Sequence, residues 1–521
     1  MDRDTFQAHA ETLRIVTFRM ILALKSGYWE AFCAWLVDCS DAFQSTRTDG
    51  EFAKNSAPLY CWPAPGFEQR DPETNERLVC KVNVAMQGRI DATRLFNSRL
   101  FALLLVKANI TRALWDRQVM IYHNSSLSNT SSSLSEVLND IKTAKDSDSQ
   151  QPPIGYAIIG WHVDDGTSIA CDVGWHLNHL DNRVVAYLSG SIMTIYAITM
   201  TGWHGKKALG FTLTLDEQRR TVNLSAPDAV SQLAKDVLGD SVKVSPKHAM
   251  TKEFVDITSE PLPAKTDPSY ESVVTERSKR RHALGVSIWL AIAYIEIMRG
   301  TNELCSNMAE PPELVGKCIR YQTMYLATHG KGLTYGPCPF GSLERPDGID
   351  VSKPLSSPKL MFFHFFSDAS LGEASSITGG IGMLAGCAIL AISQRQHLKS
   401  PGSHTSEVVA AGTNVNFVIP SSGLLQEWRI RCGARVPFYL DSATTVFVAK
   451  SDTAIKKAIW VIRRAAVIED AMVHDEIEPI HISERDMVAD PFTKYLPYEV
   501  WHRHMHYALN YEGPLPAHPR A

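Results

Sequence analysis

Two adjacent carboxylates, Asp164 and Asp165, follow the apolar run 156–160, and they constrain the fold of this chain more than any other sequence feature. A third carboxylate, Asp38, comes directly after the apolar run 32–37. The ends of neighbouring strands can bring such groups together at one edge of a sheet. Mg²⁺ prefers oxygen ligands of this kind. Two such ions can hold the attacking and leaving oxygens of a phosphoryl transfer. An Asp-Asp pair after a strand is also common in turns, so a purely structural role stays open.

A second set of acidic residues lies in the C-terminal third of the chain. Asp368 and Asp441 each follow an apolar strand, Glu407 lies near the start of an expected helix, and Asp490 precedes Pro491. Four acids in one pocket repel one another unless cations neutralise them. The pattern therefore predicts two Mg²⁺ ions that activate water against a phosphodiester. The alternative is four unrelated surface acids.

Composition is typical of a large soluble enzyme. The 521 residues indicate several domains, and 45% hydrophobic residues are enough for more than one core. The net charge of −4 and a pI near 6.5 provide no overall basic field for nucleic acid. A locally basic groove would be sufficient for a nucleic-acid enzyme, because acidic active sites offset it in the sum.

Cysteine usage and hydropathy favour an intracellular protein. The 10 cysteines show no Cys-x-x-Cys pair, so we expect reduced, buried thiols. The N-terminus lacks the apolar core of a signal peptide, so secretion is not expected. Residues 184–203 carry no charge, but Ser, Thr and Gly dilute the run, so we expect core structure and no membrane span. The run 381–392 is too short to cross a bilayer and is predicted to form strands.

Local patterns predict the elements around the first set of acids. Leu13, Val16, Met20, Ile21 and Leu24 follow helical spacing before the strand that ends at Asp38. A second helix is predicted at 92–107, with Arg94 near its start, either close to a substrate phosphate or on the surface. The Ser-, Asn- and Asp-rich segment 124–153 has almost no apolar repeat and is predicted to be a flexible insertion.

The first set of acids lies in a stretch that resembles the reverse transcriptase of copia-type LTR retrotransposons. Residues 162–165 read His-Val-Asp-Asp where the family has Tyr-Val-Asp-Asp. Further similar segments occur in the family's order. Those before residues 162–165 are 11–43, 59–67 and 87–96, and those after are 208–211, 284–291 and 330–335. Several motifs in the right order are much more specific than one, and together they cover most of the chain.

The resemblance implies roles for individual residues. Asp38, Asp164 and Asp165 would bind the catalytic metals, with the primer 3′ hydroxyl as nucleophile and little covalent work by the protein. Phe43 would lie under the incoming sugar and exclude a ribose 2′ hydroxyl, with core packing as the alternative. Gln87 would touch the nucleotide, with an exposed turn as the alternative.

The second set of acids resembles the RNase H domain that follows reverse transcriptase in copia elements. The order Asp368, Glu407, Asp441, Asp490 is the family's order, and residues 488–494 are similar to its Leu-Ala-Asp-x-Phe-Thr-Lys tail. The resemblance implies that these four acids are catalytic and hold Mg²⁺, with Mn²⁺ as an alternative. The substrate would be the RNA strand of an RNA–DNA hybrid.

The expected fold class is α/β (α+β), a right-hand polymerase of palm, fingers and thumb followed by a connection region and an RNase H-like α/β domain. The expected parts are partial fingers and palm at 1–123, the flexible insertion at 124–153 and the palm with the Asp-Asp hairpin at 154–220. Thumb and connection are expected at 221–345, and the RNase H-like domain at 346–521. The expected partners are an RNA template, a DNA primer, RNA–DNA hybrid, deoxynucleoside triphosphates and other parts of a retroelement polyprotein. A cytoplasmic retroelement particle is the expected location, with the nucleus as an alternative.

Because the chain departs from the family pattern at several positions, three hypotheses about its function stay open. The chain starts where the family's upstream fingers strands end, His162 replaces a Tyr, Thr93 replaces a Pro, and 455–459 lacks a family histidine. The first hypothesis is an active reverse transcriptase with RNase H. The second is a degenerate or host-retained copy that binds nucleic acid or a partner without catalysis. The third is a nuclease with an inert polymerase lobe.

Overall fold

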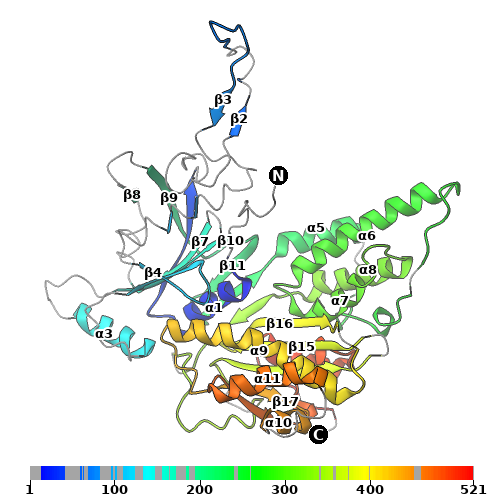
Figure 1. Ribbon diagram of the computed structural model, residues 1–521. Coiled ribbons are helices and arrows are strands. Elements are labelled where there is room, and N and C mark those ends of the chain that lie inside the picture. Colours follow the sequence, from blue (N-terminus) through cyan, green and yellow to red (C-terminus); the bar gives the residue numbers. More distant parts are fainter. Residues whose placement is uncertain are drawn as a thin grey trace. The chain divides into compact units, whose positions relative to one another are not determined.

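The protein has a mixed α/β fold with several sheets, and its contacts divide it into two compact units (Figure 1). The first unit comprises Met1–Ile21 and Glu30–Trp203, and the second comprises Leu22–Trp29 and His204–Ala521. The computed structural model describes residues 13–40, 59–61, 63, 69–82, 96–97, 100–101, 110–123, 133–146, 155–162, 165–171, 184–186, 194–239, 245–258, 260–339, 342–355, 359–372, 375–397, 399–450 and 459–519. The finer division into five parts stays a prediction.

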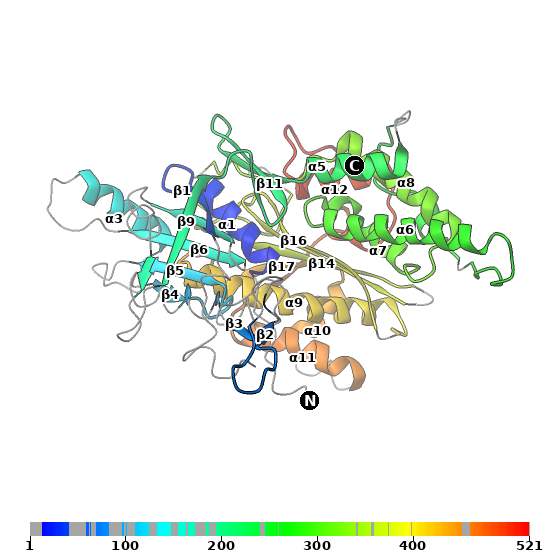
Figure 2. The same cartoon turned by 90° about the horizontal axis from the view of Figure 1, so that it is seen from above.

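A seven-stranded antiparallel sheet forms the centre of the first unit, in the order β4-β5-β6-β7-β1-β9-β8 (Figure 2). Helix α1 (Ile15–Gly27) begins on this sheet, where a Cβ at Gly160 of β6 would meet the side chains of Leu13 and Ile21. The predicted helix and the strand that follows it are confirmed. The strands are β1 (Cys33–Ser40), β4 (Ile110–Arg112), β5 (Val119–His123), β6 (Tyr156–His162), β7 (Asp165–Ala170), β8 (Val184–Ala186) and β9 (Thr194–Gly202).

The uncharged run 184–203 forms β8 and β9, which pair with each other, and β9 also pairs with β1. The described parts of this run are therefore strands of the seven-stranded sheet, and the expectation that the run belongs to the core stays a prediction. Of the predicted helix at 92–107, only four residues are described, and among them Phe96 and Leu100 are fully buried.

The predicted flexible insertion contains a helix, α3 (Leu134–Asp146), so the prediction was wrong for these residues. Ser133 and Glu136 form a capping box: the Ser133 amide donates to Glu136 Oε2 at 2.7 Å, and the Glu136 amide donates to Ser133 Oγ at 3.3 Å. Leu134 and Val137 are fully buried. The helix thus has a satisfied N-terminus and two buried apolar residues, although the composition of the whole segment indicated disorder.

The cysteine prediction was correct only in part. No disulfide occurs among the cysteines that the structure describes, and Cys171, Cys318, Cys387 and Cys432 are buried. Cys61 and Cys80 are exposed instead. They lie opposite each other in the backbone register of the separate two-stranded sheet of β2 (Leu59–Cys61) and β3 (Cys80–Val82). A sheet of two strands has no central strand to cover a thiol.

The second unit begins with a four-stranded antiparallel sheet in the order β10-β11-β12-β13. The side chain of Asn223 on β12 donates to the carbonyl of Lys331 at 2.9 Å and to Thr334 Oγ1 at 3.0 Å, which ties the distant strand β13 to this sheet. The strands are β10 (Lys206–Ala208), β11 (Phe211–Asp216), β12 (Thr221–Ser225) and β13 (Leu333–Tyr335); the helices nearby are α5 (Pro227–Leu238), α6 (Tyr270–Leu290), α7 (Met298–Cys305) and α8 (Glu313–His329).

A five-stranded sheet in the order β16-β15-β14-β17-β18 carries the C-terminal part of this unit. The first three strands pair antiparallel, whereas β14, β17 and β18 run parallel. The elements are β14 (His364–Ser370), β15 (Ile377–Leu384), β16 (Cys387–Arg395), α9 (Ser403–Glu427), β17 (Val436–Leu440), α10 (Ala443–Ala449), α11 (Ile459–Val473), β18 (Ile477–His481) and α12 (Tyr498–Ala508). The prediction of strands at 381–392 is confirmed.

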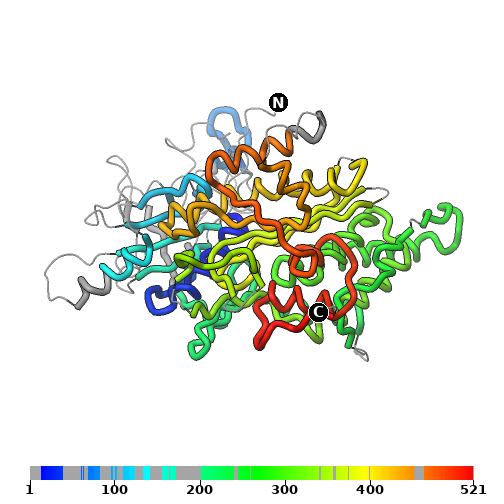
Figure 3. Tube along the Cα trace, turned by 90° about the horizontal axis from the view of Figure 1, so that it is seen from below, coloured from blue at the N-terminus to red at the C-terminus, as the bar shows by residue number. Residues whose placement is uncertain are grey.

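Helices α9 and α11 lie on one side of the five-stranded sheet, and α12 lies on the other (Figure 3). Of the helices that the structure describes, α9 has the length and apolar composition of a membrane span. Within its most apolar window 72% of the residues are buried, and α9 packs against β14, β15 and α11. Most of its apolar window therefore belongs to the core of this unit.

Candidate metal centre

Parallel pairing of β14 with β17 brings two of the predicted acids to the same level of the sheet. Ser367 pairs with Leu440 in the register, so the next residue on each strand, Asp368 and Asp441, lies on neighbouring strands. Asp368 is only 1% exposed, whereas Asp441 is half-buried. The strand residues before each acid are buried, and this fixes both carboxylates beside the packed part of the sheet.

Helix α9 supplies the third acid, Glu407, one turn after the helix begins. The buried side chain of Asn414 fixes the helix on the sheet, because its Nδ2 donates to Ser367 Oγ and to the Gly379 carbonyl, both at 2.8 Å. One ligand oxygen each from Asp368, Glu407 and Asp441 lies within 4.8 Å of the others. We call these three residues the carboxylate triad, and it could hold a metal ion.

Two oxygens of the carboxylate triad have no hydrogen-bond partner among the described residues. They are Asp368 Oδ1 and Glu407 Oε2, and both are buried. A buried carboxylate oxygen without a partner is costly. A hard divalent cation with oxygen ligands would satisfy both atoms at once, so the residues present fit such an ion.

The fourth predicted acid, Asp490, lies outside the carboxylate triad and is held by a lysine. Lys494 Nζ lies 3.1 Å from Asp490 Oδ1 and 3.8 Å from Asp368 Oδ2. The hydroxyl of Thr493 also donates to Asp368 Oδ2. The structure thus brings the four predicted acids together in part, with three in the triad and the fourth bridged to it by an ammonium group.

Sequence reasoning missed the role of Lys494, although the residue lies in the tail motif. The spacing of four residues from Asp490 was a usable signal, because an acid and a base at this spacing in a helical turn can pair. Burial lowers the pKa of Lys494, but the carboxylates of Asp368 and Asp490 outweigh burial and raise it overall. Lys494 is therefore charged at neutral pH.

Without a bound cation, the pKa values of the four acids of this site lie above those of free carboxyl groups. Burial raises the pKa of Asp368 to about 6, with Asp441 raising it further and Lys494 opposing. Burial, Asp368 and Asp441 raise the pKa of Glu407 to about 10. Burial also raises the pKa of Asp441 and, together with the charge of Asp368, that of Asp490. Burial is the largest cause of each shift, and repulsion from nearby carboxylates adds to it. A bound cation would oppose both effects.

Gly379 is a local requirement of the site. It pairs with Asp368 across β14 and β15, and a Cβ at this position would collide with the side chain of Thr493 and lie 3.1 Å from the Ala489 carbonyl. Gly379→Ala is expected to push the segment carrying Asp490 away from Asp368 and to cost roughly 1–3 kcal/mol of stability. Thermal denaturation and Mn²⁺ titration would measure both effects.

Gly202→Ala is the matched control, because Gly202 also lies on a strand, is exposed, and a Cβ there meets no atom within 4 Å. We expect it to denature and to bind Mn²⁺ like the unaltered protein. Equal behaviour of the two variants would contradict the tight approach of residues 489–493 to β15.

The first set of acids lies in the seven-stranded sheet of the other unit. Asp38 on β1 and Asp165 at the start of β7 are direct partners in the antiparallel register, and both are exposed. Strands β6 and β7 also pair, with His162 opposite Asp165, so residues 163–164 connect them. The fold therefore joins two carboxylates that are far apart in the sequence. The other predicted residues of this site, Phe43, Gln87, Arg94 and Asp164, lie outside the described residues.

The described residues define a mixed α/β protein in which the five-stranded sheet and helix α9 carry a partly buried carboxylate triad able to hold a metal ion. No protein-family model matches this chain, and no curated protein matches its sequence. The chemistry of the site therefore has to be inferred from its own residues.

Proposed function

We propose that the second unit is a divalent-metal-dependent nuclease of the RNase H type, which hydrolyses the RNA strand of an RNA–DNA hybrid. The observation that carries the proposal is the carboxylate triad, with buried oxygens that lack partners and with Asp490 beside it. The order of these acids along the chain and their placement on two parallel strands and a covering helix support the same conclusion.

Asp368, Glu407 and Asp441 would hold the metal, for which Mg²⁺ is the proposed ion and Mn²⁺ the alternative. When bound, the ion would lower the pKa of a water molecule and stabilise charge on the phosphate. Thr493 orients the Asp368 carboxylate through its hydroxyl, and Lys494 holds Asp490 in place. Asn414 keeps the helix that carries Glu407 at a fixed position on the sheet.

We further propose that the first unit is the palm of a copia-type reverse transcriptase and that the chain is part of a retroelement polyprotein. The pairing of Asp38 with Asp165 at a hairpin supports this second function. RNA template, DNA primer and deoxynucleoside triphosphates would be its substrates. Contacts to backbone and 2′ hydroxyl would dominate binding, so little preference for template sequence is expected.

The test is cleavage of a labelled RNA–DNA hybrid with Mg²⁺, run beside primer extension on an RNA template. Asp441→Asn is expected to slow hybrid cleavage by about 100-fold or more, since the metal supplies several kcal/mol of stabilisation, and to leave extension unchanged. Asp38→Asn is expected to abolish extension and to leave cleavage unchanged. Asp347→Asn, an exposed acid outside both sites, serves as the control for both assays.

Each outcome selects one function. Cleavage without extension would leave a nuclease with an inert polymerase unit. If the unaltered protein neither cleaves nor extends, catalysis is excluded and a noncatalytic retroelement-derived role takes its place. Cleavage that survives Asp441→Asn would refute the assignment of the carboxylate triad.

A further inference from the structure

The segment 490–494 belongs to the metal centre, and an arginine from a distant helix holds it in place. Thr493 lies in this segment, and its hydroxyl donates to Asp368 of the carboxylate triad. The backbone carbonyl of the same Thr493 accepts a hydrogen bond from Nε of Arg299 on α7 at 3.0 Å. Arg299 therefore contacts the residue that orients Asp368, although it lies 194 residues earlier in the chain.

Arg299 is buried and is held by an ion pair. Its side chain is 6% exposed, and its guanidinium pairs with Glu303, one turn later on α7. The other carboxylate oxygen of Glu303 contacts Arg395 at the end of β16, at 2.5 Å. A guanidinium is planar and presents its donors in a fixed geometry. Because Glu303 holds one side of the group, the direction of the Nε–H bond is fixed as well.

Helix α7 has a fixed position, because both α8 and β16 hold it. Gln322 on α8 donates to the Ile297 carbonyl at 3.2 Å and accepts a hydrogen bond from Thr301 Oγ1 at 3.1 Å. Asn302 donates to Ser393 Oγ on β16 at 3.2 Å. The arginine on this helix therefore reaches the metal centre from a rigid base.

We propose that Arg299 is a positioning residue of the metal centre. It fixes the backbone of Thr493, and the Thr493 hydroxyl in turn holds Asp368, one of the three acids of the triad. The inference rests on the function proposed above and deepens it. Tight metal binding would then require helix α7, which precedes the five-stranded sheet in the chain and contributes no ligand.

The test variant is Arg299→Met with Glu303→Gln. It removes the donor to the Thr493 carbonyl, and it removes the ion pair as a whole, because a single substitution would leave a buried charge without its partner. Arg395→Met is the first control. It removes the other ion pair of Glu303 and keeps the contact of Arg299 with Thr493.

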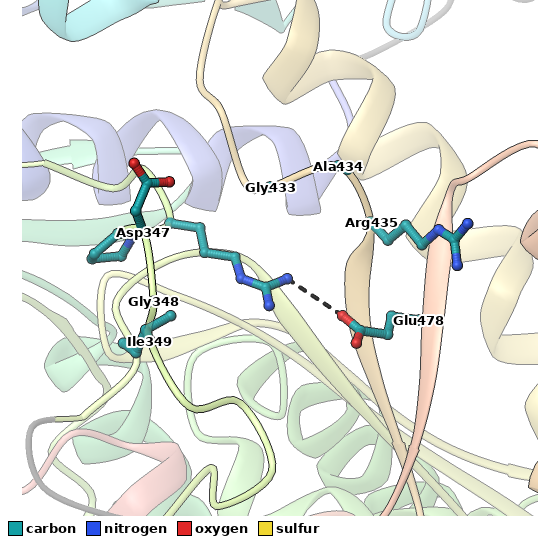
Figure 4. A pocket seen from close by; sticks show the side chains of 9 residues that line it. Asp347, Gly348, Ile349, Gly433, Ala434, Arg435 and Glu478 are labelled. Atoms are coloured by element: carbon teal, nitrogen blue, oxygen red, sulfur yellow. Dashed lines mark hydrogen bonds and ion pairs between the residues drawn. The ribbon is translucent and has the colours of Figure 1, made fainter.

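A second arginine–glutamate pair of the same unit provides a control with the same two substitutions. Arg345 pairs with Glu478 on β18 at 3.4 Å, along the dashed line in Figure 4. The pair lines a cavity of about 490 Å³, and the lining includes no described residue of 490–494. Arg345→Met with Glu478→Gln therefore shows what the loss of such a pair does to the unit without any change at the metal centre.

The experiment measures the dissociation constant of Mn²⁺ in the full chain without nucleic acid, by electron paramagnetic resonance of the free ion. Groups that hold metal ligands in place typically contribute about 10–100-fold to metal affinity. The Arg299 variant is expected to bind Mn²⁺ about 10-fold more weakly or worse. Both controls are expected to bind it like the unaltered protein. Thermal denaturation checks that each variant is folded at the temperature of the titration.

A double-mutant cycle separates positioning from a general loss of structure. Thr493→Val removes the hydroxyl that donates to Asp368, and it is expected to weaken Mn²⁺ binding by about 10-fold. Adding the Arg299 and Glu303 substitutions to Thr493→Val is expected to cost little more, because both changes act through the same hydrogen bond. If the two losses multiply instead, Arg299 does not act through Thr493 and the proposal is overturned.

The remaining outcomes also decide between the proposals. Equal Mn²⁺ binding in the Arg299 variant and in both controls overturns the positioning role and leaves the carboxylate triad intact. If the unaltered protein binds no Mn²⁺, the triad is not a metal site, and the proposed nuclease fails together with this inference. Should the Arg299 variant not fold, Arg299→Lys, which keeps a positive charge beside Glu303, takes its place under the same criteria.

Discussion

Replacing Lys494 by methionine is expected to destabilise the metal-free protein by roughly 3–5 kcal/mol, because it leaves buried carboxylates without their ammonium partner. Lys494 contacts both Asp490 and Asp368, which are 5% and 1% exposed. Methionine keeps most of the aliphatic volume, so the change is chiefly electrostatic. Thermal denaturation in EDTA measures it, and Mg²⁺ is expected to restore most of the loss by supplying the missing positive charge.

The loss should depend on pH in a defined direction. Without Lys494 the pKa values of Asp368 and Asp490 rise further, and an acid whose pKa is raised by folding loses stability as pH rises from its ordinary pKa towards the raised one. The deficit is therefore small near pH 5 and large near pH 8. Lys353→Met at an exposed position is the control. A deficit of equal size at both pH values would contradict this account.

Glu296→Gln is expected to stabilise the protein at alkaline pH. Glu296 is 4% exposed, and neither of its carboxylate oxygens accepts a hydrogen bond from another described residue. Burial raises its pKa to about 8 from an ordinary value of 4.5. Stability from the protonated form is present below pH 4.5 and is lost as pH rises to 8, amounting to roughly 4–5 kcal/mol, because each tenfold change in proton affinity is worth about 1.4 kcal/mol.

Glutamine cannot ionise, so the variant should avoid this loss. Denaturation at pH 5 and at pH 9 is the measurement, with a gain over the unaltered protein that is small at pH 5 and reaches several kcal/mol at pH 9. The exposed Glu271→Gln on α6 is expected to change stability by less than about 0.5 kcal/mol at either pH. No difference between the two variants at pH 9 would show that Glu296 is neutralised by another route.

Much of the local structure near the candidate sites was predictable from the sequence. Apolar runs ending in Asp38, Asp368 and Asp441 predicted strands, and β1, β14 and β17 are those strands. The prediction failed at α3. It relied on the composition of the whole segment and did not use the capping box of Ser133 and Glu136, which is visible in the sequence. Average composition says little about a short helix whose end is satisfied and whose two apolar residues are buried.

The sequence by itself determined which residues could end a strand and which acids were candidate metal ligands, because strand periodicity and carboxylate chemistry are local properties. Tertiary structure alone decided that three acids form the triad while Asp490 pairs with Lys494. It also decided that Thr493 contacts Asp368, 125 residues away, and that Asn414 holds α9 against β14 and β15. Burial, pKa and the balance of charge depend on which distant segments exclude water around a group, and no window of sequence contains that information.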